Sequence, residues 1–499
     1  MIWNIAAAML VAGLLRCFRL GAQSLWIDEV FTWYGADIGR PMPLATLLEN
    51  VHGPLYSLML HLWGGVAGDS EWALRLPSAL LGTASVPAFA WLAARWLGRE
   101  CAVPAAWLTA GSPFLIWYSQ EARNYALLFP CVALASVAML SLRERLSFGG
   151  FAGWVAAWAA GLLTNLSCVL LAPLHLYWWM SARHDRRRRL WVVAVSALVL
   201  LAVLSPWLPR LASVWDWKRL DPAGPSSTEA LRGGPAISPG AYPFTLHAFA
   251  VGYTLGPGIR EIRTRGGGRA LRSHLPELLV VGLLFAGLGV LAVRAAARRR
   301  VVLVALLALM VPVLLVSYGA LQNFKVYHPR YVAVAFPFVI ALLAAGLADA
   351  KPRLRAVLAL ALALVWGLSL HHHYFVPGYG KEDMRNAAAI VKARAGPGDR
   401  IIAAGADDVL IYYYRGPLRV ERYWLGWAAN PDRMALKLEA ARAGARNLWV
   451  VWSRGEDLDP EGRFLRHLQT RYPAAETFET EGVKVWRLPG TANPAGTGG

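Results

Sequence analysis

Long apolar stretches recur along the first three quarters of the chain, separated by short polar segments. A stretch of about 20 apolar residues is long enough to cross the hydrocarbon core of a bilayer as a helix. The pattern therefore predicts a polytopic α-helical membrane protein with about 11 transmembrane helices, and we expect the first to be retained rather than cleaved as a signal peptide. The predicted spans lie near residues 3–20, 72–94, 101–118, 124–142, 150–164, 166–181, 190–208, 276–293, 301–318, 331–348 and 356–371.

Basic residues gather in the short connections on one side of these spans. They lie at Arg95 and Arg99, Arg143 and Arg145, Arg183 to Arg189, Arg294 to Arg300 and Lys351 to Arg355. Lys and Arg in short loops favour the cytoplasm. We therefore expect the three large loops, 21–71, 209–275 and 372–499, to lie outside. Arg16 and Arg19 depart from this rule, and the apolar but Gly/Pro-interrupted stretch 53–67 is typical of a partly embedded or juxtamembrane helix.

The C-terminal region has a different pattern, in which strand-like and helix-like periods alternate. Helices are predicted over 382–395, 432–443 and 461–472, and strands over 400–404, 447–452 and 483–488. Such alternation indicates a small α/β domain. We divide the chain into a membrane module over 1–371, an extracytoplasmic α/β domain over 372–489 and a disordered, Gly/Pro/Thr-rich tail over 490–499.

Composition narrows the classes of function. The net charge is +19, but 57% of the residues are hydrophobic and the basic residues are spread between apolar spans, so we expect no nucleic-acid partner. The four cysteines lie in or beside apolar spans and suggest buried thiols, not disulfides or a zinc site. No Walker-type GxxxxGK[ST] sequence and no convincing GxGxxG after a strand is present, and no cytoplasmic loop has room for a nucleotide-binding domain.

Asp28 and Glu29 are the most informative pair of residues, because they open the first outer loop directly after an apolar span. Carboxylates placed against a bilayer are costly and usually serve chemistry or ion handling. Neighbours on a helix point about 100° apart, so only one of the two is expected to face a given substrate atom. We assign general-base chemistry to Asp28 and a supporting catalytic role to Glu29. The alternative is a helix-terminal acid paired with Arg16 or Arg19.

Three further groups of polar residues lie at outer ends of spans. Glu121 and Tyr125 are four residues apart and would share a helix face, with Arg123 between them able to meet a phosphate or a carboxylate. Lys325 and Arg330 lie with tyrosines such as Tyr331 at a membrane boundary. This combination suits an anionic headgroup or an ordinary interfacial belt. The candidate donor-phosphate and substrate-binding residues are His52, Tyr56, Glu121, Arg123, Tyr125, Lys325, Arg330 and Tyr331. We expect no metal site at His371–His373, because consecutive histidines rarely converge on one ion.

The order of these motifs resembles the GT-C glycosyltransferases of glycosyltransferase family 39, the protein O-mannosyltransferase and aminoarabinose transferase group. The resemblance covers nearly the whole chain and is strongest over its first 130 residues, although each motif is weak alone. Leu163-Thr164-Asn165 departs from it, since many relatives carry a histidine after the threonine. The matching stretches are Leu15-Arg16, Ser24-Leu25-Trp26-Ile27-Asp28-Glu29, His52-Gly53-Pro54-Leu55-Tyr56, Arg75-Leu76-Pro77-Ser78, Ser119-Gln120-Glu121-Ala122-Arg123-Asn124-Tyr125, Arg330-Tyr331 with Pro337, and Lys381-Glu382-Asp383-Met384-Arg385.

The resemblance implies transfer of one sugar from a polyprenyl-phosphate carrier to an acceptor hydroxyl, with inversion, on the outer face of a bacterial cytoplasmic membrane. Asp28 would remove the proton of the acceptor hydroxyl. The departing lipid phosphate needs positive charge in a poorly hydrated cleft, for which Arg123, Lys325, Arg330 and His52 are candidates. No cofactor is required, although a divalent cation is compatible with the carboxylates. The expected partners are the lipid-linked donor, a glycan, lipid or protein acceptor, and the bilayer.

Three other interpretations remain open. A GT-C relative that transfers whole glycans, such as an oligosaccharyltransferase or a ligase, would share the Asp-Glu loop after the first span and would differ only in its substrate. A transporter or flippase of lipid-linked glycans would also be polytopic, but it would place charges near the midplane and show internal repeats. A noncatalytic accessory paralogue would not need both carboxylates and Arg123. The sequence does not distinguish mannose, glucose, galactose, arabinose and aminoarabinose as the sugar, and it leaves the acceptor open.

Overall fold

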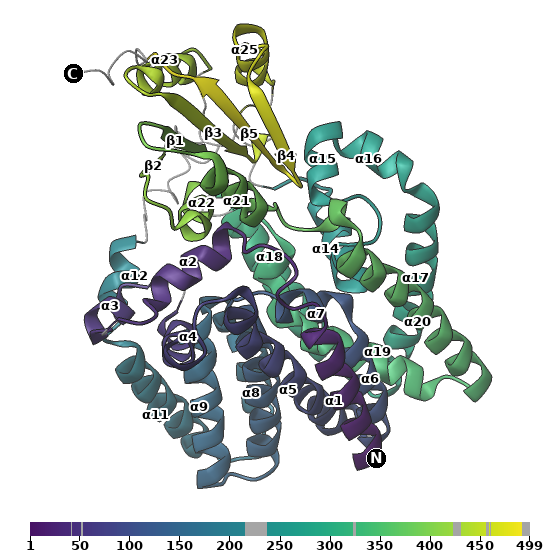
Figure 1. The fold of residues 1–499 in the computed structure, drawn as a ribbon. Helices are drawn as coiled ribbons and strands as arrows, with labels where there is room; N and C mark the ends of the chain where they lie inside the picture. The colour runs from purple at the N-terminus through teal and green to yellow at the C-terminus, as the bar shows by residue number, and fades with distance from the viewer. Residues whose placement is uncertain are drawn as a thin grey trace.

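A computed structural model describes residues 1–40, 42–50, 53–214, 237–322, 326–422, 431–455, 459 and 461–491. Figure 1 shows a large helical part with a small α/β domain at one end of it, at the top of the view. The short helices α2 and α4, from the first loop, lie between these two parts.

The helical part follows the predicted spans closely. Each of the eleven predicted segments contains helix, and the stretch 53–67 forms α4. Up to the α/β domain the α-helices are α1 (Ile2–Cys17), α2 (Ile27–Ala36), α3 (Leu44–Leu48), α4 (Pro54–Ala67), α5 (Glu71–Leu97), α6 (Ala102–Gly111), α7 (Pro113–Ser119), α8 (Tyr125–Glu144), α9 (Phe148–Thr164), α10 (Ala172–Met180), α11 (Arg186–Leu204), α12 (Leu208–Val214), α14 (Ala241–Val251), α15 (Ile259–Arg265), α16 (Gly267–Ser273), α17 (Leu275–Arg298), α18 (Val302–Leu321), α19 (Phe336–Asp349) and α20 (Pro352–Phe375). The 3₁₀ helices are η1 (Arg99–Cys101), η2 (Leu166–Leu171), η4 (Pro329–Ala335) and η5 (Pro377–Tyr379).

Among the described residues, six segments are long and apolar enough to cross a membrane: α5, α8, α17, α18, α20, and η4 together with α19. They fall into two groups. The most apolar stretches of α5, α8 and α19 are mostly buried inside the protein, whereas only about a quarter of the residues in those of α17, α18 and α20 are buried. Exposed leucines such as Leu283 and Leu364 on the second group suit contact with lipid. The protein is therefore a multi-pass membrane protein, with some of its shorter apolar helices, α1, α9 and α10, packed beside the six.

The predicted span 101–118 is not one continuous helix. It divides into α6 and α7 at Ser112, because Pro113 cannot continue the hydrogen-bond ladder. Arg16 of α1 fills this break: its guanidinium donates to the carbonyl oxygens of Thr109 at 2.9 Å and Ala110 at 3.0 Å. The side chain is fully buried. Because Arg16 is buried inside the protein, the preference of Lys and Arg for short cytoplasmic loops does not apply to it.

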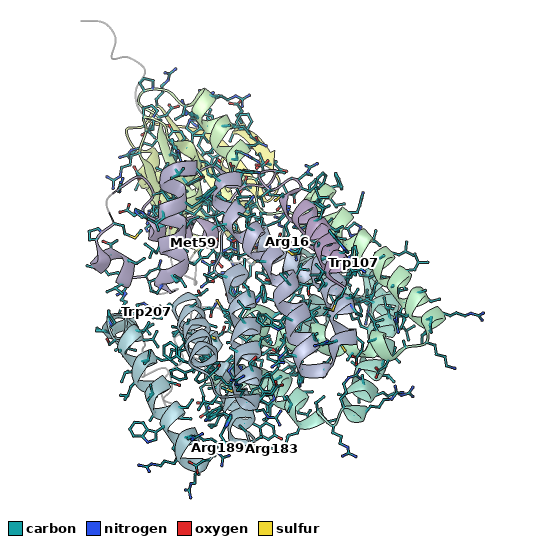
Figure 2. All side chains as sticks on the ribbon, turned by 90° about the horizontal axis from the view of Figure 1, so that it is seen from below. Arg16, Met59, Trp107, Arg183, Arg189 and Trp207 are labelled. Atoms are coloured by element: carbon teal, nitrogen blue, oxygen red, sulfur yellow. The ribbon has the colours of Figure 1, made fainter. Side chains whose placement is uncertain are left out.

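The basic connections lie together at one end of the helical part. Arg95 pairs with Glu144 at 2.8 Å, and Arg299 pairs with Asp349 at 2.8 Å. Figure 2 places Arg183 and Arg189 at the edge of the molecule away from the C-terminal sheet. The charge clusters that the sequence assigned to one side of the membrane thus share one face of the structure.

The C-terminal α/β domain confirms the three predicted helices and three predicted strands. Its helices are α21 (Met384–Arg394), α22 (Asp407–Tyr414), α23 (Pro431–Arg442) and α25 (Arg463–Arg471), and its strands are β1 (Arg400–Ala404), β2 (Val420–Arg422), β3 (Asn447–Ser453), β4 (Glu476–Thr480) and β5 (Val483–Pro489). The sheet order is β2-β1-β3-β5-β4, with β1 parallel to β2 and β3, and β5 antiparallel to β3 and β4.

Among the described elements of this domain, the strands β2 and β4 and the helix α22 were not predicted. Both missed strands are at the edges of the sheet, where polar side chains are common and the apolar pattern is weak. The boundary also differs, since α20 continues past residue 372 to Phe375. Of the predicted tail, residues 492–499 lie outside the described residues.

Candidate functional site

The site is built around the first turn of α2. Trp26 precedes the helix, and its N–H donates to Glu29 Oε2 at 3.2 Å, which fixes the start of the helix. Asp28 and Glu29 occupy this turn, where the helix dipole favours negative charge. The two carboxylates point to different surroundings, as the helical spacing predicts.

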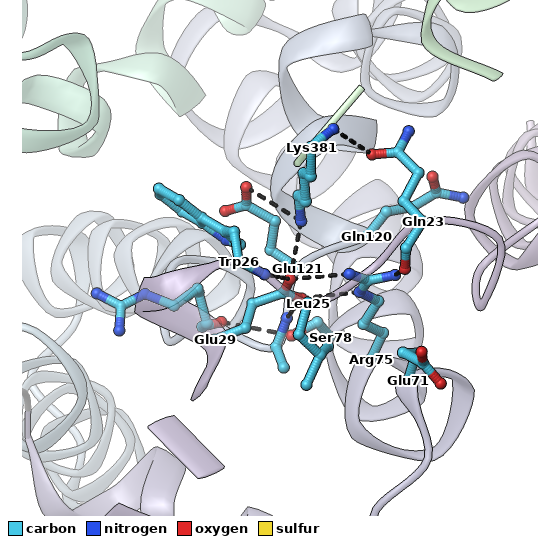
Figure 3. Close-up of polar contacts among 12 residues, drawn as sticks. Gln23, Leu25, Trp26, Glu29, Glu71, Arg75, Ser78, Gln120, Glu121 and Lys381 are labelled. Carbon is cyan, nitrogen blue, oxygen red and sulfur yellow. Dashed lines mark hydrogen bonds and ion pairs between the residues drawn. The ribbon is translucent and has the colours of Figure 1, made fainter. Parts of the chain in front are cut away.

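Glu29 lies in a closed network of ions (Figure 3). Arg75 of α5 donates to both of its oxygens, each at 2.8 Å, and Lys381 Nζ lies 3.0 Å from Oε2. The N–H of Ala122 adds a contact to Oε1 at 2.9 Å. Arg75 also donates to three carbonyl oxygens of the first loop, those of Leu20, Gln23 and Ser24. Glu29 is fully buried, so it holds the first loop, α5 and the start of the C-terminal domain together.

Glu121 approaches the same network from the turn before α8. Its Oε1 lies 3.6 Å from Lys381 Nζ and has no hydrogen-bond partner among the residues that the structure describes. The expectation that Glu121 and Tyr125 share a helix face is wrong, because α8 begins only at Tyr125. Residues 120–124 instead form a turn, in which the N–H of Arg123 donates to the carbonyl oxygen of Glu121 at 2.8 Å.

Asp28 faces two arginines on the other side of α2. Arg330 of η4 donates to Asp28 Oδ2 at 2.8 Å, and Arg123 Nη2 lies 3.9 Å from the same oxygen. Arg123 Nη1 donates to the backbone oxygen of Asp28 and to Thr32 Oγ1, both at 3.0 Å. The Asp28 side chain remains 21% exposed, in contrast to Glu29 at 0%. Within the described part of the chain, the Nε atoms of both arginines have no hydrogen-bond partner.

The three carboxyls differ in pKa. Burial raises the pKa of Asp28, but the charges of Arg123, Arg330 and Arg454 outweigh it and hold the pKa below its usual range. Burial also opposes ionisation of Glu29, yet Arg75 and Lys381 lower its pKa to about 2. Burial raises the pKa of Glu121, and the neighbouring charge of Glu29 adds to this effect.

The remaining candidate residues hold different positions. Tyr56 is buried, and its hydroxyl lies 2.7 Å from Ser78 Oγ, which in turn donates to the carbonyl oxygen of Arg123. Tyr125 is buried against the ring of Tyr118, and the hydroxyl of Tyr331 accepts from Arg330 Nη2 at 3.2 Å. Two other candidates, His52 and Lys325, lie outside the described residues.

Three residues of the site were not among the predicted site residues: Arg75, Lys381 and Arg454. Arg75 is a charge inside an apolar span, and such a charge is rarely present without a polar partner. Lys381 lies in a short polar run directly after the last span, so its return to the first loop could not be inferred from sequence distance. Arg454 follows β3 in the C-terminal domain and brings a further positive charge toward Asp28.

The histidines of α20 do not converge. His372 contacts the carbonyl oxygen of Thr254 at 2.8 Å and stacks on Tyr379, whereas His373 contacts Gln120 Oε1 at 2.8 Å. In the described ranges, no group of three or more His, Cys, Asp or Glu side chains is placed to hold a metal ion.

Comparisons with known proteins agree with this architecture. Residues 51–209 match a family model described as dolichyl-phosphate-mannose-protein mannosyltransferase. The crystal structure of ArnT from Cupriavidus metallidurans in the apo state is similar over 97% of each chain, with a TM-score of 0.59 and 14% sequence identity. Its complex with undecaprenyl phosphate gives a TM-score of 0.57 over the same share of each chain, also at 14% identity.

A more distant similarity points to the same fold. The archaeal oligosaccharyltransferase AglB from Archaeoglobus fulgidus, in complex with an inhibitory peptide and a dolichol-phosphate, matches 99% of this chain and 75% of its own, with a TM-score of 0.54 and 12% identity. A comparison with curated protein sequences gives no match. The chain is thus a multi-pass membrane protein with the GT-C fold, which it shares with ArnT and AglB.

Proposed function

We propose that this protein transfers a single sugar from a polyprenyl-phosphate carrier to an acceptor hydroxyl. The observation that carries the proposal is the position of Asp28, a partly exposed carboxylate held between Arg330 and Arg123. The fold is shared with ArnT, which was crystallised with undecaprenyl phosphate, and with the oligosaccharyltransferase AglB in complex with dolichol-phosphate. A base beside two phosphate-binding groups is the minimum that this reaction needs. The acceptor oxygen must lose a proton while the sugar leaves its phosphate.

The two arginines would stabilise the departing phosphate. A guanidinium presents several N–H donors in a plane that matches phosphate oxygens. Arg330 has a further contact to the hydroxyl of Tyr331, and Arg123 is fixed through Thr32 and the backbone of Asp28. Both arginines would therefore be held in place before the donor arrives. The leaving lipid phosphate is a stable anion, so it would need no general acid.

Asp28 would act as the general base once the donor is bound. Without donor, the pKa of Asp28 is held low because its carboxylate pairs with the two arginines. A phosphate that binds these arginines adds negative charge beside Asp28, and this raises the pKa of the carboxyl toward the range of a useful base. Attack of the acceptor oxygen on the face of the sugar opposite the phosphate would invert the anomeric carbon.

Glu29 would act through other residues. Its oxygens are occupied by Arg75, Lys381 and backbone N–H groups, so we assign it a positioning role in place of contact with substrate. Tyr56 would likewise support the Arg123 turn through Ser78. The mechanism requires no organic cofactor, and a divalent cation is compatible with it without being required.

We place the reaction on the outer face of a bacterial cytoplasmic membrane, because the basic loops form the opposite end of the helical part from Asp28. The acceptor is a hydroxyl of a glycan, lipid or protein. The sugar is one of the hexoses or pentoses that polyprenyl phosphate carries.

The test is sugar transfer by the purified protein in nanodiscs. A panel of polyprenyl-phosphate sugars is offered with cell-envelope extract, with and without a chelator, and the Asp28→Asn variant serves as background. Transfer from one donor that the variant does not perform would support the proposal. Movement of the lipid-linked sugar across the bilayer without cleavage of its phosphate bond would overturn it in favour of a transporter, and folded protein that neither cleaves nor moves any donor would favour an accessory role.

A further inference from the structure

A cavity of about 210 Å³ lies on the far side of the Glu29 network from Asp28. Its wall comes from the segment after α1, the end of α7 with the turn after it, the end of α20 and the linker that opens the C-terminal domain. Asp28, Arg123 and Arg330 do not line it. Lys381, Arg75 and Glu121 do, so the ion network forms a partition between the cavity and the proposed reaction centre.

Two buried acceptor atoms on the wall have no hydrogen-bond partner among the described residues: Glu121 Oε1, which lies 3.6 Å from Lys381 Nζ, and His373 Nδ1. The tautomer of His373 follows from its contacts. Gln120 Nε2 donates to the carbonyl oxygens of Arg16 and Phe18, so Gln120 Oε1 faces His373 and accepts from its Nε2–H. In a neutral imidazole, Nδ1 is then an acceptor. Buried acceptors are normally satisfied, and these two call for a ligand that donates hydrogen bonds.

Most charges of the wall are compensated by protein partners, and the guanidinium of Arg19 lies over the ring of Phe375. Lys381 pairs with Glu29, Arg385 with Glu71, and Glu481 with Arg260. An inorganic anion brings no hydrogen-bond donor to Glu121 Oε1 or His373 Nδ1, and the ammonium of Lys381 disfavours a second cation beside Glu121. A neutral ligand rich in hydroxyl groups is the complementary chemistry.

The aromatic part of the wall and the size of the cavity narrow this class further. Trp117, Tyr374 and Phe375 line the cavity beside the polar groups, and the rings of Trp117 and His373 are 5.4 Å apart. An apolar cavity of about 150 Å³ accommodates benzene. A cavity of about 210 Å³ therefore has room for a six-membered ring that carries hydroxyl groups.

We infer that this cavity is a binding site for one neutral sugar ring, separate from the reaction centre around Asp28. Glu121 and His373 would accept hydrogen bonds from ring hydroxyls, and Trp117 would pack against the C–H face of the ring. Because Lys381 lines the cavity and also contacts Glu29, a sugar bound here would touch the network that positions α2. The inference does not depend on sugar transfer at Asp28, so either can fail alone.

The test is saturation-transfer NMR with free glucose, mannose, galactose and arabinose, added to the full-length protein in deuterated detergent without any lipid donor. Saturation should reach the ring protons of at least one sugar in the wild type. Two variants should weaken that binding by about fivefold or more: Glu121→Gln, which removes the carboxylate with little change of shape, and Ala22→Trp, which adds bulk at the exposed rim of the cavity.

Two matched variants serve as controls. Glu277→Gln alters a carboxylate away from the cavity, and Asp28→Asn alters the proposed reaction centre; both should leave sugar binding within about twofold. The inference is overturned by no saturation transfer to any sugar in the wild type. It is equally overturned by binding that both cavity variants leave unchanged, by binding that Asp28→Asn abolishes, or by displacement of the sugar by inorganic phosphate.

Discussion

Asp28 and Glu29 are neighbours in the chain but lie in opposite kinds of environment. Glu29 is fully buried and is contacted by Arg75, Lys381 and the N–H of Ala122. Asp28 is partly exposed and faces two arginines whose Nε atoms have no hydrogen-bond partner in the described part of the chain. Glu29 thus completes a network, whereas Asp28 lies beside arginines that still have N–H donors available.

The difference separates stability from chemistry within one helical turn. A buried carboxylate with every oxygen occupied has nothing left to offer a substrate. A partly exposed carboxylate can give up its contacts with Arg330 and Arg123 when a phosphate binds these arginines. We therefore expect substitutions on the Glu29 side to act on folding and substitutions on the Asp28 side to act on turnover.

Substitution Glu29→Gln should have the largest effect on stability. It leaves the buried charges of Arg75 and Lys381 without their carboxylate, which typically costs about 3–5 kcal/mol. Thermal unfolding in detergent should show a large fall in the midpoint. Glu144→Gln, which breaks the exposed pair with Arg95, is the matched control and should cost at most about 1 kcal/mol. Equal effects of the two variants would contradict a closed network around Glu29.

Substitution Arg330→Gln should act mainly on the rate. Loss of one preorganised donor to a developing negative charge usually lowers kcat by about 10²–10³-fold. The thermal midpoint should change far less than in Glu29→Gln. Arg265→Gln, on an exposed helix and paired only with Glu261 among the described residues, controls for net charge and should retain full activity. A fall in the thermal midpoint with a normal kcat would mean that Arg330 stabilises the fold and does not act in turnover.

The pH dependence of stability should follow Glu29. The pKa of Glu29 is lowered from 4.5 to about 2 in the folded protein, so its contribution is present above pH 4.5 and is lost as the pH falls toward 2. A shift of this size corresponds to about 3 kcal/mol. Denaturant unfolding followed from pH 6 to pH 3 should show more than half of this loss in the wild type. The free energy of unfolding should depend less steeply on pH in Glu29→Gln than in the wild type. Identical slopes would show that other carboxyls dominate the pH dependence.

Substitution Tyr56→Phe should have the smallest effect. It removes the hydrogen bond to Ser78, at a cost of about 1 kcal/mol, and leaves the Arg123 turn otherwise intact. Transfer should stay within about threefold of the wild type. A loss of about 100-fold would mean that the hydroxyl touches the donor, as a direct binding role requires.

The sequence was sufficient to predict most of the architecture. Apolar stretches of spanning length and the alternating C-terminal pattern identify their elements directly, because burial requires hydrophobic residues at regular positions. The break at Ser112 and the turn at Glu121 were missed, since both lie inside or beside strongly apolar sequence. The edge strand β4 was missed because its sequence is mostly polar and shows only a weak apolar pattern.

The site was predictable only in part. Asp28, Arg123 and Arg330 were candidates for one site, and the structure places them in contact. The contact between Lys381 and Glu29 joins residues 352 positions apart, and no local pattern specifies it. The closed character of the Glu29 side follows from five donors that converge from four segments of the chain, which only the folded structure reveals.

The most direct test of the account measures turnover and donor affinity together in Asp28→Asn. We predict that kcat falls by about 10²–10⁴-fold, because the acceptor hydroxyl loses its base. We also predict that the polyprenyl-phosphate donor binds at least as tightly as in the wild type, because the carboxylate no longer competes for Arg330. Turnover within a few-fold of the wild type, or loss of donor binding in a folded variant, would contradict the role of Asp28.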